Sequence, residues 1–329
     1  MLVQQKRLQS VYREINHNDR LAYILIAVIT ASVTIIEFHE IFTVDPIYNG
    51  YKFVQQTIEP NCSWDSLPYG RGGINWYLVC VSYLGTGNSN VVPFAISMGL
   101  VPMSFLFARK YGGNLAGMLT AIGLVLNPVF LIFDSVSAYA QTWTVFFLAS
   151  LYLIKKFSML SAITFNLALF SKAIPMAWGP FIIYGIFRSK MAPNKKYVLY
   201  AGIGIPLIIL WSLSLFDGGS MVYGYMSFKP VSYQSLIDTI SWTWTAFRWN
   251  EEILFAMPVL FGIYLWKKKK WQIPVLPMEL LAVSMVSFFG IAFFTVEGYF
   301  PYRILPNLVM FLFAAATLLQ KGLEARFRL

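Results

Sequence analysis

Leu21-Ala-Tyr-Ile-Leu-Ile-Ala-Val-Ile-Thr-Ala-Ser-Val-Thr-Ile-Ile-Glu37 is the stretch of sequence that decides the fold class. Its only charged side chain is the last one, and its length falls within the ~17–25 residues that a membrane-spanning helix needs. The polar residues 1–20 precede it, and no small-residue cleavage site follows it. Because a signal peptide has a shorter apolar region and such a cleavage site, we expect a retained first span.

The rest of the chain repeats this apolar character. Of its 329 residues, 57% are hydrophobic and 12% are charged, whereas about 25% of the residues in a soluble domain are charged. Further candidate spans are Val91–Ala108, Leu115–Phe133, Ala138–Ile154, Tyr197–Phe216, Ile253–Trp266, Leu280–Val296 and Ile304–Leu319. We therefore expect an all-α polytopic integral membrane protein, with roughly nine or ten membrane-embedded helices and with loop helices on the outer face, in a single transmembrane domain over residues 1–329.

Two further apolar regions are irregular. Ile74–Leu84 is too short to cross a bilayer comfortably, so we expect it to be interfacial or re-entrant, and the sequence leaves a true span open as the alternative. Met159–Phe187 is too long for one span and is broken by Lys172 and Pro175. We predict that it forms two short helices that enter the membrane and return.

The basic residues indicate the orientation of the chain. A net charge of +10 would suggest nucleic acid as the partner of a soluble protein, but here Lys and Arg form short clusters between apolar runs. Placing these clusters in the cytoplasm puts 19 of the 25 basic residues there, in agreement with the positive-inside rule. We expect cytoplasmic N- and C-termini, contact with membrane lipid, and no nucleic-acid partner.

Two long polar segments then lie outside the membrane, at about residues 39–90 and 217–252. The first contains the only two cysteines, Cys62 and Cys80. Because Cys80 lies in an apolar run, we expect neither a disulfide bond between them nor a metal site on them. Any chemistry that the protein carries out should belong to these outer segments.

Acidic residues follow the first span, in Glu37-Phe-His-Glu-Ile-Phe-Thr-Val-Asp45. A carboxylate at the outer membrane face can act as a general base, or can hold a metal ion beside a phosphate. The alternative is that acids at a helix exit are simply solvated. Pro46 makes Asp45 a candidate helix N-cap, which predicts a short helix over residues 47–58 along the outer face.

Four basic residues on the outer side are candidates for binding a lipid phosphate. Lys172 lies among apolar residues, where a charge costs about 2.5–3.5 kcal/mol at mid-membrane. Arg303 lies where the last span begins, and an arginine makes bidentate bonds to phosphate. Arg71 and Arg248 are the further candidates. The alternative roles are a snorkelling side chain for Lys172 and an ion pair with Glu297 for Arg303.

Several short motifs follow the outward acids in order along the chain. They are Arg109-Lys-Tyr-Gly-Gly, Leu126-Asn-Pro-Val-Phe, Gln141-Thr-Trp-Thr-Val-Phe-Phe-Leu, Leu169-Phe-Ser-Lys-Ala-Ile-Pro and Tyr302-Arg-Ile-Leu-Pro. This order resembles the GT-C superfamily of membrane glycosyltransferases, which holds the dolichyl-phosphate-mannose-dependent mannosyltransferases. The resemblance extends over most of the chain, through motifs that are short and degenerate.

The resemblance implies an active site at the outer face and a sugar, such as mannose, carried on a polyprenyl phosphate. It implies an acid in the first outer loop as general base or as ligand of a divalent cation, and this acid maps to Asp45, with Glu40 second. The phosphate of a lipid-linked sugar sits at the interface, within reach of Lys172 and Arg303. The acceptor would be a glycan, a lipid or a protein.

Two other functions fit the same composition. A transporter or flippase for a lipid-linked solute would use the same cations without a base, and it would need access from both faces. A non-catalytic subunit of a membrane complex would have an aromatic lateral face and no converging charges.

Overall fold

The computed structural model describes residues 14, 16, 18–42, 54–64, 74–133, 139–171, 174–216, 232–294 and 301–327. Within these ranges every regular element is a helix, which confirms the all-α prediction. The α-helices are α2 (Asp19–Glu37), α4 (Ile74–Thr86), α5 (Val91–Gly112), α6 (Asn114–Val125), α7 (Pro128–Phe133), α8 (Tyr139–Leu153), α9 (Ser158–Ser171), α10 (Gly179–Arg188), α11 (Pro193–Leu199), α12 (Ile205–Phe216), α14 (Tyr233–Phe247), α15 (Glu251–Lys267), α16 (Leu276–Phe294) and α17 (Leu305–Phe327). Short 3₁₀ and π elements are η1 (Phe38–Phe42), η2 (Val54–Ile58), η3 (Glu59–Asn61), η4 (Ile174–Trp178), η5 (Tyr200–Gly204) and η6 (Pro301–Ile304).

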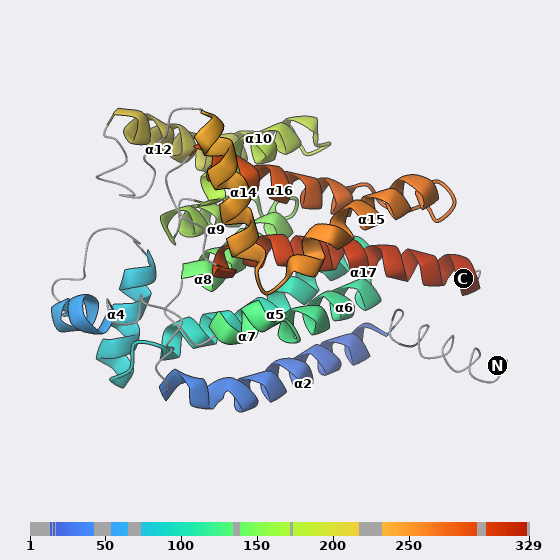
Figure 1. The fold of residues 1–329 in the computed structure, drawn as a ribbon. Coiled ribbons are helices and arrows are strands. Elements are labelled where there is room, and N and C mark those ends of the chain that lie inside the picture. The colour runs from blue at the N-terminus through green and yellow to red at the C-terminus, as the bar shows by residue number, and fades with distance from the viewer. Residues whose placement is uncertain are drawn as a thin grey trace.

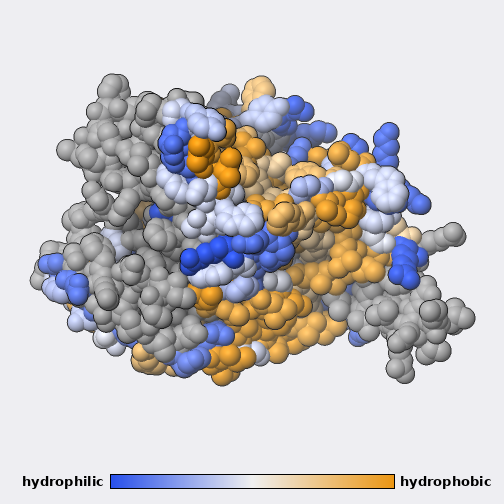
Figure 2. Space-filling model, in the orientation of Figure 1, coloured by the Kyte–Doolittle hydropathy of each residue, from blue (hydrophilic) through white to orange (hydrophobic). Residues whose placement is uncertain are grey.

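Among the described residues, three helices are long and apolar enough to cross a membrane, namely α2, α5 and α17. Only Ala22 and Ile26 of α2 are buried, while Ile35 and Ile36 are 77% and 63% exposed. Lipid tolerates such an apolar surface and water does not, so the chain is an integral membrane protein. Figure 2 shows apolar surface over much of the lower part of the molecule, where Figure 1 places α2.

The core lies where α5, α6, α8 and α17 pack together (Figure 1). Phe107 and Phe313 are fully buried, and their ring centroids lie 5.3 Å apart. Gly117 allows α6 to approach α5 closely, because a Cβ at this position would lie 2.9 Å from the backbone oxygen of Phe105. Dense packing of this kind leaves the two ends of the bundle as the places where polar groups gather.

The expected span Leu115–Phe133 is divided into α6 and α7 instead of forming one helix. Pro128 is the cause, since proline has no backbone N–H and its ring clashes with the carbonyl four residues earlier in a helix. Asn127 starts the new helix, because its Oδ1 accepts a hydrogen bond of 3.0 Å from the backbone N–H of Val129.

The irregular regions form short helices. α4 has 13 residues and is therefore about 20 Å long, less than the ~30 Å of the hydrocarbon core, which fits the prediction that it does not span. Residues 159–187 form two short helices, α9 and α10, as predicted. The segment 217–252 was expected to be a polar loop, but it contains the 15-residue helix α14, which packs against α16.

One end of the bundle gathers basic residues, and we call it the basic end. The Nζ of Lys110 donates a hydrogen bond to the backbone oxygen of Tyr152, and the Nζ of Lys195 donates one of 3.3 Å to that of Lys155. The start of α2 and the end of α17 lie at this end (Figure 1). The expected clusters of basic residues between the spans are therefore neighbours in space.

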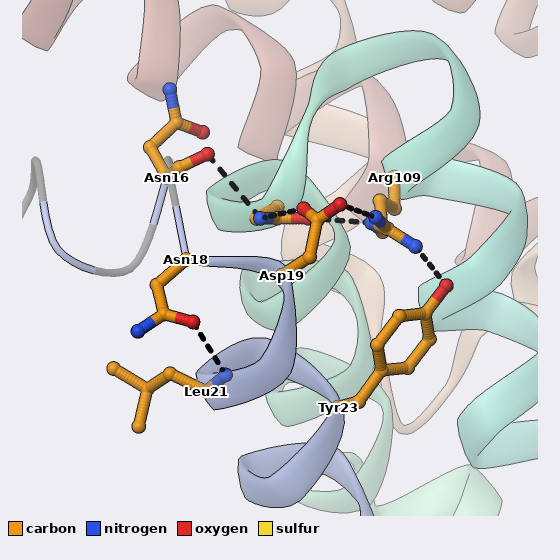
Figure 3. A network of polar contacts seen from close by, with 7 residues as sticks. Asn16, Asn18, Asp19, Leu21, Tyr23 and Arg109 are labelled. Atoms are coloured by element: carbon orange, nitrogen blue, oxygen red, sulfur yellow. Dashed lines mark hydrogen bonds and ion pairs between the residues drawn. The ribbon is translucent and has the colours of Figure 1, made fainter.

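A polar network fastens α2 at the basic end. Asp19 lies 2.8 Å from a guanidinium nitrogen of Arg109, whose other arm reaches the hydroxyl of Tyr23 (Figure 3). Asn114, at the start of α6, donates to Asp19 at 2.9 Å and accepts from Arg109. The side chain of Asn18 caps α2 by accepting from the backbone N–H of Leu21 at 3.1 Å (Figure 3). The network thus joins the starts of α2 and α6 to the end of α5.

The expectation that the two cysteines are not bonded is wrong. Cys62 and Cys80 form a disulfide bond, with their Cα atoms 5.3 Å apart. The run that contains Cys80 forms α4. This run is apolar because α4 packs against the short elements that precede Cys62, and not because lipid surrounds it on all sides. Together they enclose a small core, separate from the main one, that includes Val54, Ile58 and Trp76.

Candidate functional site

The candidate site lies at the end of the bundle opposite the basic end. α17 has 23 residues and is therefore about 35 Å long, so its start lies far from its end at the basic end. The short helix η6 precedes α17 and packs against α14 and α7. At this end, η6, α7, α14 and the turn between α14 and α15 surround the start of α17.

Arg303 is the most notable side chain at this end. It belongs to η6 and is only 6% exposed. Arginine keeps its charge under all ordinary conditions and offers five N–H donors in a planar fork. A buried guanidinium therefore requires acceptors, and an anionic ligand is one group that supplies them.

The turn between α14 and α15 carries the second cation, Arg248. This side chain is exposed, and its guanidinium lies 4.4 Å from the centre of the Trp249 ring. Arg248 directly follows α14, and α14 packs against η6, the element that contains Arg303. Figure 2 shows a hydrophilic patch in the middle of the molecule, where Figure 1 places this turn.

Two amides, one buried and one half-buried, connect the same turn to α7. Asn250 is fully buried, and its Oδ1 accepts a hydrogen bond from the Nδ2 of Asn127. The Nδ2 of Asn250 has no hydrogen-bond partner among the described residues. These two amides were not among the predicted site residues, and the sequence signal that could have found Asn127 is the Asn-Pro pair inside an apolar run.

Lys172 lies outside the described residues, but the residues on both sides of it are described. The backbone oxygen of Ser171 accepts a hydrogen bond of 2.6 Å from Asn75 of α4. On the other side, the backbone oxygen of Ala177 accepts one of 3.3 Å from Ser287 of α16. The chain up to Ser171 is therefore attached to α4, and the chain from Ile174 onward is attached to α16.

The same part of α16 also holds the segment that carries Arg303. Asn307, one turn beyond Arg303 in α17, donates a hydrogen bond of 2.9 Å to the backbone oxygen of Ser284. Ser284 and Ser287 lie on adjacent turns of α16, three residues apart. The described residues that follow Lys172 and those that follow Arg303 are thus attached to neighbouring positions on one helix.

Glu40, the one predicted acid that the structure describes, lies on another side of this end. Glu40 is in η1, where the backbone oxygen of Ile41 accepts a hydrogen bond of 2.9 Å from Asn88. This places Glu40 beside α2 and the start of α5, whereas Arg303 and Arg248 lie beside α14 and α17. Asp45 and Arg71 are outside the described residues.

The predicted helix over residues 47–58 is described only from Val54 onward, where η2 forms one turn, and Glu297 also lies outside the described residues. Among the described residues, no group of three or more His, Cys, Asp or Glu side chains is placed to hold a metal ion.

The fold is similar to that of a solved membrane protein, ArnT from Cupriavidus metallidurans bound to undecaprenyl phosphate. The two structures align with a TM-score of 0.57 over 90% of this chain, at 14% sequence identity. This chain spans about 60% of the length of that protein. No protein-family model matches the sequence, and no curated protein sequence matches it.

Proposed function

We propose that the protein is a GT-C-type membrane glycosyltransferase, which transfers a sugar such as mannose from a polyprenyl phosphate donor to a glycan, lipid or protein acceptor. The observation that carries the proposal is the buried guanidinium of Arg303 at the non-basic end of the bundle. The similar fold of a protein that binds undecaprenyl phosphate supports a donor of this chemical class.

The proposal includes an orientation in the membrane. Both termini would be cytoplasmic, because the basic end would face the cytoplasm under the positive-inside rule. The site would then open at the outer or lumenal face. The disulfide bond at the opposite end agrees with this orientation, since disulfide bonds persist in oxidising compartments outside the cytoplasm.

The residues would divide the reaction between them. Arg303 and Lys172 would bind the donor phosphate, with Arg248 and Arg71 near its entrance. Asp45, or Glu40 in its place, would accept the proton of the acceptor hydroxyl. The hydroxyl oxygen would bond to the anomeric carbon as the bond from that carbon to the phosphate oxygen breaks, and the phosphate would leave on its lipid. A divalent cation, if one is required, would be held by Asp45.

Binding of undecaprenyl phosphate to the purified protein tests the phosphate site. We expect Arg303→Ala to raise the Kd by about 10- to 100-fold, since a hydrogen bond to a charged group contributes about 1.5–3 kcal/mol. Arg303→Lys should have a smaller effect because it keeps the charge and loses only the planar fork. Arg326→Ala is the matched control, since Arg326 is an exposed arginine at the other end of α17.

Thermal unfolding of each variant separates a lost ligand contact from a lost fold. An Arg303→Ala protein that unfolds as the parent does and binds the lipid with parental affinity would contradict the proposal. A protein that binds the lipid but transfers no sugar from any polyprenyl-linked donor would favour the transporter or the non-catalytic subunit.

A further inference from the structure

A large hollow lies at the basic end, away from the candidate site. Its volume is about 1150 Å³, above the ~300–1,000 Å³ that is usual for small-molecule pockets. Its walls come from α5, α8, α10, the start of α11 and α16. No residue of the proposed reaction lines it, so the glycosyltransferase proposal does not account for it.

The interior of this cavity is apolar. Phe107, Trp178, Phe181, Leu280 and Val283 are among the residues that line it. The cavity follows α10 from Arg188 at one end to Trp178, just before the other end. Ten residues of helix measure about 15 Å, which is half of the ~30 Å hydrocarbon core of a bilayer. The cavity therefore has about the depth of one leaflet.

The mouth of the cavity is positively charged. Four cations and one acid line it, namely Lys155, Arg188, Lys190, Lys195 and Glu279. The first four come from three segments of the chain that follow α8, end α10 and begin α11, so the charge is concentrated by folding and not by sequence alone. The excess of cations at the mouth fits an anionic head group, and the apolar interior of leaflet depth fits a hydrocarbon chain. Together they are complementary to one chemical class, an amphiphile with an anionic head.

We propose that this cavity binds an anionic phospholipid of the membrane. The phosphate of the lipid would contact the cations at the mouth, and an acyl chain would fill the apolar interior as far as Trp178. The proposal depends on the cavity and its charges, and it would hold even if the candidate site at the opposite end had another function.

Gly185 provides a direct test, because it lines the cavity and a Cβ added there would meet no atom within 4 Å. A larger side chain can therefore enter the cavity without disturbing the protein, and leucine also favours the helix over glycine. Gly262 of α15 is the matched control, since it is helical and exposed and its added Cβ also meets nothing within 4 Å, away from the cavity.

Native mass spectrometry of the full chain in detergent measures the lipid retained. With added phosphatidylglycerol we expect one molecule per protein, and with phosphatidylcholine or inorganic phosphate much less binding. Gly185→Leu should weaken phosphatidylglycerol binding about tenfold or more by occupying the space of the chain. Gly262→Leu should bind as the parent does. Equal binding by Gly185→Leu and the parent would overturn the proposal.

The charges at the mouth are tested by a second pair of variants. Arg188→Gln with Lys190→Gln should weaken binding about 25-fold, since one cation near an anionic lipid contributes about a factor of five. Lys269→Gln with Lys270→Gln removes the same charge from the turn after α15 and should change binding little. Equal losses of phosphatidylglycerol binding in both double variants would mean that the lipid is held by general attraction to the basic surface. Retention of undecaprenyl phosphate in place of phosphatidylglycerol would mean that the cavity is a donor site. Either result would overturn the proposal.

Discussion

Removal of the Cys62–Cys80 disulfide bond should loosen one small part of the protein and leave the bundle intact. The bond closes a loop of 18 residues, for which the chain-entropy relation gives about 3 kcal/mol of stabilisation. The core that it holds is small, with Val54, Ile58, Trp76, Val79 and Cys80 as its buried members. A core of this size contributes little alone, so the bond should supply most of the local stability.

Hydrogen exchange of the purified protein measures this effect. Reduction of the parent removes the bond without removing any side-chain heavy atom, and the Cys62→Ala/Cys80→Ala variant removes it permanently. In both we expect amide exchange in α4 to accelerate by roughly 150-fold, the factor that corresponds to about 3 kcal/mol. Exchange in α6, which is part of the main core, should not change.

Two results would refute this reasoning. Exchange in α4 that changes by less than about twofold on reduction would show that the small core is stable without the bond, since unfolded-state effects alone account for differences of that size. Faster exchange in α6 as well would show that the small core and the bundle unfold together. Labelling with a membrane-impermeant maleimide after reduction should also succeed from the outer side of intact cells, because the bond lies outside the cytoplasm in the proposed orientation.

Three other experiments test the orientation, the acids and the packing of the bundle. A reporter fused after Lys268 should report the cytoplasm in intact cells, and an external signal would reverse the proposed orientation. Asp45→Asn should lower the rate of sugar transfer about 10²- to 10⁴-fold, the usual loss of general-base help, with parental donor binding. Glu40→Gln should lower it less, and parental rates in both would remove the acids from the mechanism. Gly117→Ala should destabilise the bundle by about 1–3 kcal/mol in thermal unfolding, because the new Cβ would lie 2.9 Å from a backbone oxygen, whereas Gly99→Ala, whose Cβ meets nothing within 4 Å, should not.

The fold class and most helices could be predicted because they depend on a single property, the hydropathy of long segments. α2 begins two residues before its predicted start and ends as predicted, and α5 begins as predicted at Val91. The break before α7 was missed, although its cause is local and visible as Pro128. Hydropathy averaged over a span does not register one missing N–H, so backbone chemistry has to be considered separately.

α14 was missed for a different reason. Its sequence mixes apolar residues with Ser, Thr and Asp238, so it did not stand out from the polar segment around it. Its apolar residues form one face, and Ser235, Thr239 and Thr243 are buried against neighbouring helices. Helical periodicity, and not mean hydropathy, is the signal for such a helix.

The disulfide bond was excluded by an argument that holds only for a span. An apolar run that crosses the bilayer would carry Cys80 away from an outer loop, whereas a short helix that packs on the loop brings the two cysteines together. The expectation that residues 74–84 do not span therefore already allowed the bond. The short length of α4 removes the reason to separate Cys80 from Cys62, so a helix that does not span the membrane is compatible with the bond.

The candidate site shows which functional groups leave a mark in the sequence of a membrane protein. Arg303 stands out because it opposes the charge distribution of the whole chain, while Asn127 and Asn250 are neutral and leave no such mark. Burial then separates Arg303 from the other cations. The exposed lysines and arginines at the basic end keep water or lipid headgroups as partners, so their charge does not require a buried anion. A guanidinium that is 6% exposed has given up most of its water, and the resulting free-energy cost has to be offset by anionic or carbonyl acceptors. Arg303 has an interaction within the protein, but its planar fork offers five N–H donors. A phosphate bound at the start of α17 would add two parallel acceptors and a negative charge, and this favours that position for the donor in the proposed function.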